Sequence, residues 1–372
     1  MKIVINAFSA KLGGGQTYLT QLLRRIPEND IEIVLFAPPS LKLPLDPRVL
    51  RPKVSWPVDN PILRAIWERF RLPQILREYR ANVLFCPGGV VATKVPRGCA
   101  TVTMFRNMIP FTPAIIDSMP WSMQKARNLI LKRVMLRSMV RADLTIFISQ
   151  FAKSVIERLG PIRNGITIPH GIGPEFRNFH QNMKKPAGFP NKPYFLYVSR
   201  FDFYKHHREV VAAYADLPPE MRDLFALVLI GENNSPEADF VAQMITANGL
   251  SKHVHIMGSV PYSELPAWYF YAKLTIFASS CENCPNILLE SLGAGRPVLS
   301  SDVMPMPEFG GDDILYFSPN APKTLTKALL SVLESACLEQ RLARSAKAAS
   351  RRYDWELTAQ KTWSALRAVV AA

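Results

Sequence analysis

The sequence is short of acidic residues and of long apolar runs. The first shortage makes the chain basic, and the second excludes a membrane-spanning segment. Its 372 residues include 45 Lys and Arg against 30 Asp and Glu, which gives a formal net charge of +15. No run of about 18 uncharged apolar residues occurs, so we expect no transmembrane helix. The segment MKIVINAFSA lacks the apolar core of a signal peptide and predicts a first strand instead.

Cysteine is also scarce, and its number is odd. Five cysteines are scattered along the chain, at Cys86, Cys99, Cys281, Cys284 and Cys337. This usage favours a reducing cytosol over a disulfide-stabilised secreted fold. Cys281 and Cys284 have the spacing of a redox or metal motif, but no second pair or Cys/His cluster accompanies them. We therefore interpret both as incidental.

The basic excess is confined to the first half of the chain. Residues 1–180 contain 26 Lys and Arg against 11 acids, whereas residues 181–372 contain 19 of each. A field of this kind favours an anionic partner, namely a phosphorylated lipid, an acidic membrane surface or a nucleic acid. Two expected helical stretches combine basic and apolar side chains: residues 62–80, as one or two helices around Pro73, and residues 121–141. We expect these segments to contact the anionic partner.

The length of the chain indicates two α/β domains, because 372 residues exceed one usual hydrophobic core. Residues 177–193 are polar, contain three prolines and form the best linker. We therefore expect a first domain at 1–180, a second at 181–352 and a terminal segment at 353–372.

The most informative stretch, residues 272–301, predicts a strand, a loop, a short helix and a second strand. The strands are expected at 274–277 and 297–300. Pro285 suits the first turn of the helix, because its missing N–H would have no partner there. Two glycines before the second strand are the expected end of the helix.

Two carboxylates stand in this stretch, Glu282 directly after the first strand and Glu290 within the helix. In parallel sheets, ligands bind at the carboxyl ends of the strands and beside helix N-termini. The two side chains are therefore expected to reach different parts of one ligand.

This stretch resembles the Glu-x7-Glu motif of the retaining glycosyltransferases of GT-B fold, the large family 4 group that uses nucleotide-sugar donors. In that family the first Glu, here Glu282, lies against the donor sugar. The second, here Glu290, accepts hydrogen bonds from the ribose hydroxyls. The resemblance also makes Asn283, Pro285 and Asn286 donor-binding candidates.

A second match follows the expected strand 194–198. Arg200 and Lys205 match the family's Arg-x4-Lys clamp on the donor phosphates, in which a guanidinium binds two oxygens and an ammonium adds a compact charge. Gly231, in the family's next strand and turn, is a further donor-binding candidate. No Asp-x-Asp motif, which metal-dependent transferases of the other major fold use, occurs in the chain. We therefore expect no metal and no cofactor, with the two cations replacing the metal.

The first half offers weaker candidates. A Gly-rich turn follows the first strand, and Gly14 and Gly15 let backbone N–H groups approach an anion. It is not the dinucleotide fingerprint, because Tyr18 occupies the third glycine position. By the resemblance, this turn faces the donor phosphates or the acceptor.

The end of the strand expected at 100–104 departs from the family, because Phe105 or Arg106 stands where many relatives have a His. This departure puts a His-assisted mechanism in doubt and makes Arg106 and Asn107 the acceptor-side candidates. Asn107 equally suits a strand-end turn. His170 occupies the Asn position of the family's Pro-Asn-Gly segment, and we interpret it as a structural residue on the acceptor side.

The resemblance covers nearly the whole chain. It implies two Rossmann-like domains that face each other across a cleft, with a C-terminal helix at 353–372 crossing back to the first domain. The second domain would hold the nucleotide sugar and the first would hold the acceptor. The implied reaction is a retaining glycosyl transfer of the hexosyltransferase type, with Arg200, Lys205 and Glu282 as the catalytic residues and electrostatic stabilisation of the diphosphate as the main effect.

The charge asymmetry indicates a lipid-linked anionic acceptor at the anionic inner face of the cytoplasmic membrane. The expected protein is a cytoplasmic, peripheral enzyme of surface polysaccharide or lipopolysaccharide synthesis. One alternative is a nucleotide-sugar epimerase of the same fold, which would need acid–base side chains where Phe105 and Arg106 stand. Another is a non-catalytic nucleic-acid-binding protein, but no aromatic-interleaved basic patch supports it, so we expect no nucleic acid partner.

Overall fold

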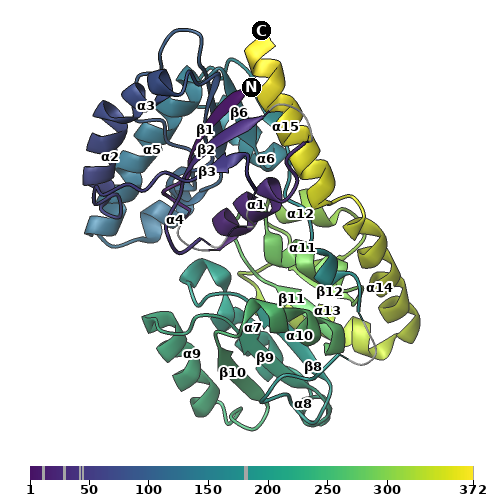
Figure 1. The fold of residues 1–372 in the computed structure, drawn as a ribbon. Helices are drawn as coiled ribbons and strands as arrows, with labels where there is room; N and C mark the ends of the chain where they lie inside the picture. The colour runs from purple at the N-terminus through teal and green to yellow at the C-terminus, as the bar shows by residue number, and fades with distance from the viewer. Residues whose placement is uncertain (11–12, 28–30, 42, 44–45, 180–182, 372) are drawn as a thin grey trace. The chain divides into compact units, whose positions relative to one another are not determined.

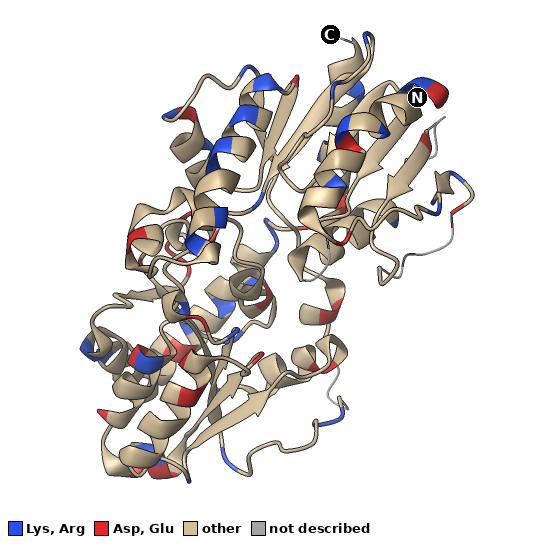
Figure 2. Ribbon diagram, turned by 90° about the vertical axis from the view of Figure 1, so that its left-hand side faces the viewer, with Lys and Arg blue, Asp and Glu red and all other residues tan. Residues whose placement is uncertain are grey.

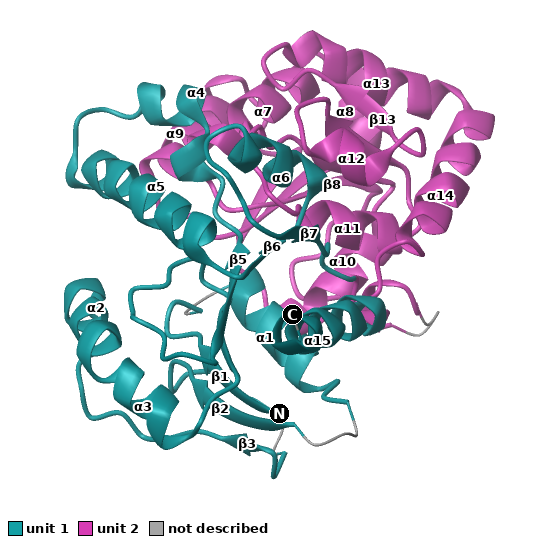
Figure 3. Cartoon of the chain, turned by 90° about the horizontal axis from the view of Figure 1, so that it is seen from above, with its two compact units in different colours: residues 1–171, 355–372 teal, residues 172–354 magenta. Residues whose placement is uncertain are grey.

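The computed structural model describes residues 1–10, 13–27, 31–41, 43, 46–179 and 183–371. The chain forms two compact units, residues 1–171 with 355–372, and residues 172–354 (Figure 3). The boundary expected at 180/181 lies outside the described residues. The boundary expected at 352/353 lies two residues before the change of unit at 354/355.

Unit 1 is built on a seven-stranded parallel sheet in the order β3-β2-β1-β4-β5-β6-β7 (Figure 1). The strand order reverses between β1 and β4, which pair directly. The strands are β1 (Lys2–Asn6), β2 (Glu32–Phe36), β3 (Val49–Leu50), β4 (Val83–Cys86), β5 (Ala100–Phe105), β6 (Leu144–Phe147) and β7 (Gly165–Thr167).

The helices of unit 1 cover both faces of its sheet. They are α1 (Gly14–Leu23), α2 (Pro61–Phe70), α3 (Leu72–Glu78), α4 (Pro113–Ser118), α5 (Met123–Arg141), α6 (Gln150–Glu157) and α15 (Trp355–Ala371), with a 3-10 turn, η1 (Ile109–Phe111). Figures 1 and 3 both show α2, α3 and α5 on one side of the sheet and α1 and α15 on the other. The expected helical segment 62–80 is two helices, because Pro73 lies in the first turn of α3 and cannot continue α2.

The C-terminal helix α15 belongs to unit 1, as expected from the resemblance. It packs against α1 and β5. At its centre the fully buried hydroxyls of Tyr18 and Thr362 lie 3.3 Å apart. Trp363 and Leu366 of α15 are also fully buried. This burial holds the end of the chain on the first sheet.

Unit 2 is built on a six-stranded parallel sheet in the order β10-β9-β8-β11-β12-β13. Its strands are β8 (Tyr194–Val198), β9 (Ala226–Ile230), β10 (Val254–Gly258), β11 (Leu274–Phe277), β12 (Val298–Ser301) and β13 (Leu315–Phe317). Its helices are α7 (His207–Ala215), α8 (Pro219–Leu224), α9 (Pro236–Ala247), α10 (Leu265–Tyr271), α11 (Asn286–Gly293), α12 (Met306–Gly310), α13 (Pro322–Glu334) and α14 (Ala336–Ser350). Three 3-10 turns are η2 (Pro174–Phe176), η3 (Phe203–Lys205) and η4 (Tyr262–Glu264). The strand order of unit 2 reverses between β8 and β11.

The stretch 272–301 has the predicted strand, loop, helix and strand. One detail was wrong: α11 begins at Asn286, so Pro285 precedes the first turn, and its carbonyl accepts a hydrogen bond from the Leu289 N–H at 3.0 Å. The helix ends at Gly293, and Gly295 follows with φ of 63°, a left-handed conformation that favours glycine. Three leucines of α11 are fully buried, Leu288, Leu289 and Leu292.

The described helices include none that is both long enough and apolar enough to span a membrane.

Candidate functional site

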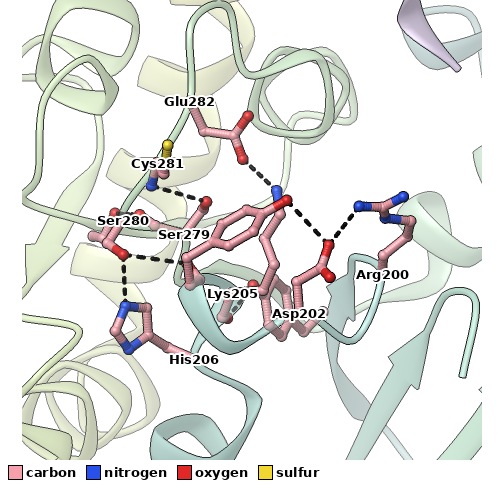
Figure 4. A network of polar contacts seen from close by, with 11 residues as sticks. Arg200, Asp202, Lys205, His206, Ser279, Ser280, Cys281 and Glu282 are labelled. Atoms are coloured by element: carbon pink, nitrogen blue, oxygen red, sulfur yellow. Dashed lines mark hydrogen bonds and ion pairs between the residues drawn. The ribbon is translucent and has the colours of Figure 1, made fainter. Parts of the chain in front are cut away.

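Three of the predicted residues meet at the carboxyl ends of β8 and β11, the place where the strand order of unit 2 reverses. Arg200 follows β8, Lys205 ends η3 and Glu282 lies in the loop after β11. Figure 4 shows the Lys205 ammonium donating a hydrogen bond to Oε1 of Glu282. A switch point of this kind is where open parallel sheets bind ligands. The two residues are 77 positions apart in the chain and are brought together only by strand pairing.

Arg200 is also paired with an acid. Its Nη2 donates to Oδ2 of Asp202 at 2.5 Å (Figure 4). The Tyr204 hydroxyl donates to the same oxygen at 3.0 Å. The sequence did not identify Asp202 as a partner of Arg200, although an acid two residues after an arginine is a signal for such a pair. In this structure Arg200 and Lys205 therefore each have a carboxylate partner.

His206 joins the two loops of this site. It has φ of 55°, which turns the chain from η3 into α7, and its Nε2 lies 2.8 Å from Oγ of Ser280 (Figure 4). The next residue, His207, is fully buried and stacks on Phe201 with ring centroids 4.0 Å apart. Burial, with a contribution from Lys205, lowers the pKa of His207 to about 3, so this ring stays neutral and supports the loop.

Gly231 follows β9 beside the same loop. A Cβ at this position would collide with the Ser199 carbonyl oxygen and lie 3.0 Å from the Arg200 nitrogen. Its own N–H donates to the Gly258 carbonyl at 2.9 Å. Glycine is therefore needed for the close approach of β9 to the loop that carries Arg200.

The second predicted carboxylate, Glu290 of α11, is buried, with only 8% of its surface exposed. The Tyr262 hydroxyl donates to its Oε1 at 2.9 Å. Burial raises the pKa of Glu290 to about 8, the Tyr262 hydrogen bond opposes this rise, and the nearby Glu175 carboxylate adds to it. Sequence reasoning did not find Tyr262, because nothing in its local pattern points to α11. Three other predicted donor-binding residues lie between Glu282 and Glu290, on the loop and at the start of α11: Asn283, Pro285 and Asn286.

In unit 1, the predicted residues Gly15, Arg106 and His170 gather around Tyr18. A Cβ on Gly15 would lie 3.0 Å from Nη1 of Arg106. The Arg106 guanidinium lies 5.9 Å from the centre of the Tyr18 ring. The His170 ring stacks on the Tyr18 ring with centroids 5.5 Å apart, and its centroid lies 5.3 Å from that of the Trp355 ring. From the sequence, Tyr18 stood out only because it occupies the third glycine position of the dinucleotide fingerprint. Gly14 is the first residue of α1.

Phe105 and Arg106, the two candidates for the position of the His in the resembling family, lie in different environments at the end of β5. Phe105 is fully buried and packs on Phe111 with ring centroids 5.1 Å apart, so Arg106 is left beside Gly15. Asn107 accepts a hydrogen bond from the Ile109 N–H at 3.2 Å and therefore shapes the turn into η1. The epimerase alternative needs an acid–base side chain here. A phenylalanine in the core and an always-protonated guanidinium do not supply one.

Groups of three or more His, Cys, Asp or Glu side chains with the geometry of a metal site are absent from the described part of the chain. Cys281 and Cys284 are both buried, and they are not joined in a disulfide.

Two family models match the chain and together span almost all of it. The model for Glycosyltransferase Family 4 matches residues 12–176. The model for Glycosyl transferases group 1 matches residues 178–349. The division between the two matches lies close to the change between the compact units.

A curated glycosyltransferase and several solved structures are also similar to this chain. The O-antigen chain mannosyltransferase B of Escherichia coli is 24% identical over 298 residues, which are 78% of this chain and 76% of that protein. The structure of sucrose-phosphate synthase from Thermosynechococcus elongatus matches with a TM-score of 0.79 at 16% identity, over 100% of this chain and 99% of that one. The structure of HepE from Anabaena in complex with UDP matches with a TM-score of 0.75 at 20% identity, over 99% and 100% of the two chains. The chain is therefore a glycosyltransferase of the group 1 family, of the family 4 type and with the GT-B fold.

Proposed function

We propose that this enzyme transfers a sugar from a nucleotide-sugar donor, with retention of the anomeric configuration, to a lipid-linked acceptor in surface polysaccharide or lipopolysaccharide synthesis. The observation that carries the proposal is the meeting of Arg200, Lys205 and Glu282 at the switch point of unit 2. Support comes from the UDP bound in HepE and from the O-antigen mannosyltransferase among the relatives.

The chemistry follows from the charges of this site. When the bond between sugar and diphosphate breaks, negative charge develops on the leaving diphosphate. Arg200 binds two phosphate oxygens as a fork and Lys205 adds a point charge, so both stabilise that charge as it forms. The two cations take the place of a metal ion. The leaving phosphate takes the proton of the acceptor hydroxyl, so no side chain is assigned as a general base.

Donor binding changes the partners of the clamp. The diphosphate replaces Asp202 at Arg200 and Glu282 at Lys205, because it offers more anionic oxygens to each cation. Glu282, released from Lys205, is then free to face the donor sugar. Glu290 accepts the ribose hydroxyls, and Gly14, Gly15, Arg106 and Asn107 serve the phosphates or the acceptor from unit 1.

The acceptor proposal rests on the surface of unit 1. Three apolar side chains at a spacing of four residues are exposed along α2, with 73%, 41% and 69% of the surface exposed at Ile62, Ile66 and Phe70. Ile66 and Phe70 also line a pocket of about 480 Å³ together with Trp56 and Arg71. An apolar row beside basic residues suits the interface of an anionic membrane.

Helix α5 presents the same combination. All six basic residues of 121–141 lie on it, and Figure 2 shows Lys and Arg along its length. Met123 and Ile130 are exposed on the same helix, at 91% and 63%. Because α2 and α5 lie on the same side of the unit 1 sheet, one membrane surface can contact both (Figures 1 and 3). Each basic residue near an anionic surface contributes about 1 kcal/mol to binding. The proposed enzyme is thus cytoplasmic and peripheral to the membrane.

The donor half of the proposal is tested by thermal-shift measurements against UDP-, GDP- and ADP-sugars, followed by NMR of the transferred sugar's anomeric configuration. A stabilising donor and a product with the donor's configuration are expected. A protein that none of these donors stabilises, or an inverted product, contradicts the proposal.

A further inference from the structure

We propose that Tyr262 is a positioning residue for the ribose of the donor, because its hydroxyl holds the Glu290 carboxylate in place for the two ribose hydroxyls. The inference rests on the proposed function, which puts a nucleotide at Glu290. Tyr262 opens η4, at the entrance to α10, and Glu290 lies 28 positions further along the chain in α11. The contact therefore links two separate elements of unit 2.

The geometry of Tyr262 suits this role. Its hydroxyl donates to Oε1 of Glu290 at 2.9 Å. Its ring lies against Phe176, which is fully buried, with centroids 5.4 Å apart and planes at 63°. Tyr262 keeps 47% of its surface exposed, and its contact with Phe176 orients the ring whose hydroxyl reaches the carboxylate. An ionised carboxylate has about four acceptor positions, so one hydroxyl from Tyr262 leaves room for two from ribose.

Burial and the Glu175 carboxylate disfavour the ionised form of Glu290, so the hydrogen bond from Tyr262 matters for its charge. Three described titratable groups interact with Glu290, and all are acids or phenols: Glu175 on η2, Tyr262 on η4 and Tyr269 on α10. Helix α14 also packs against α11, but its Lys347 lies against Gly295, beyond the end of the helix. Of the influences on Glu290, the Tyr262 hydroxyl is the one that favours the ionised form. Its loss should make Glu290 harder to ionise.

Nucleotide binding should therefore depend on pH. Ribose hydroxyls donate hydrogen bonds, and the ionised carboxylate accepts them. Burial raises the pKa of Glu290 to about 8, so the protonated form dominates below that pH and binding strengthens as the pH rises through it. At pH 7 about one tenth of the molecules are ionised, so the apparent Kd is about tenfold above its value at high pH. The terminal phosphate ionises near pH 6, so measurements from pH 7 to 9 separate the two effects.

The test is a calorimetric titration of UDP, GDP and ADP into the wild-type protein and Tyr262→Phe from pH 7 to 9. In the variant, we expect the midpoint of the pH dependence to move upward and the affinity at pH 7 to fall roughly threefold to tenfold, since one pKa unit is a tenfold change. The two curves should converge at the highest pH. Tyr316→Phe is the matched control, because Tyr316 donates its hydroxyl to the Gly311 carbonyl at 2.8 Å in another part of unit 2.

A second comparison isolates the carboxylate. Glu290→Gln should abolish the pH dependence, and adding Tyr262→Phe to it should leave the profile flat. The 2′-deoxy form of the nucleotide should bind less tightly than the ribose form in the wild type, with a smaller difference in Glu290→Gln. An unchanged midpoint in Tyr262→Phe, or an equal loss of affinity at every pH, overturns the positioning role while nucleotide binding stands. Failure of all three nucleoside diphosphates to bind overturns the proposed function and this inference with it.

Discussion

Glu282→Gln should strengthen the binding of a free nucleoside diphosphate while it lowers turnover. In this structure the Glu282 carboxylate is paired with the Lys205 ammonium. The Glu282 side chain is only 17% exposed and the Lys205 side chain only 11%. A diphosphate must displace this carboxylate before Lys205 can bind it. Glutamine keeps the shape of the side chain and removes the competing charge.

The magnitude lies between two limits. Hydrogen bonds to charged groups contribute about 1.5–3 kcal/mol, and exposed ion pairs contribute about 0.2–1 kcal/mol. The partly buried pair belongs between these limits, at about 1–2 kcal/mol, which corresponds to roughly fivefold to thirtyfold tighter binding. Turnover should fall, because the carboxylate that faces the donor sugar in the proposed complex is lost. The variant should also be less stable without nucleotide, since Lys205 is left without its carboxylate partner.

Calorimetry with UDP, GDP and ADP measures the affinity, and steady-state kinetics with the donor measures turnover. Glu237→Gln is the matched control, because Glu237 forms a 2.5 Å ion pair with Arg208 in the same unit. This control should change neither nucleotide affinity nor turnover. Weaker or equal diphosphate binding in Glu282→Gln would refute the reasoning that Glu282 competes with the donor for Lys205.

Three further predictions concern Arg200, the two carboxylates and the exposed apolar row of α2. Arg200→Ala should lower kcat/KM for the donor by about tenfold to a hundredfold, because it loses charged hydrogen bonds of about 1.5–3 kcal/mol each; unchanged kinetics in the folded variant would remove Arg200 from the site. Glu290→Ala should weaken binding of the free nucleoside diphosphate, whereas Glu282→Ala should lower turnover without weakening that binding; calorimetry with the opposite pattern would exchange the two roles. Replacing the exposed apolar row of α2 by serine should reduce sedimentation with anionic liposomes at low salt, with neutral liposomes as the control; equal and negligible binding of the wild type to both liposome types would contradict the membrane proposal. The residues replaced in that variant are Ile62, Ile66 and Phe70.

The order of strands and helices could be read from the sequence, because it depends on local patterns. The runs 194–198 and 274–277 were expected as strands, and the structure has β8 and β11 at these same residues. A proline at 73 divides one predicted helical segment into two, since the ring removes the N–H that continues a helix. Glu282 and Glu290, set between a strand, a helix opened by proline and a Gly-x-Gly exit, resemble the family's motif, and the family model that matches residues 178–349 agrees.

The departures at the end of β5 needed the structure. Sequence alone left either Phe105 or Arg106 in the place of the family's His. Successive residues of a strand point to opposite faces, but which face is the core depends on what packs there. Phe111 and Phe147 cover Phe105, and this leaves Arg106 beside Gly15.

The partners of the charged groups were likewise decided only by tertiary structure. The sequence identified Arg200, Lys205, Glu282 and Glu290 as charges, and it could not show that each lies against a partner in the folded chain. Lys205 meets Glu282 because β8 and β11 pair as neighbours. Glu290 of α11 meets Tyr262 of η4, which lies 28 positions earlier in the chain. Local patterns determine which residues form strands and helices. The order in which strands pair, and thus which distant side chains become neighbours, depends on the burial of the whole sheet.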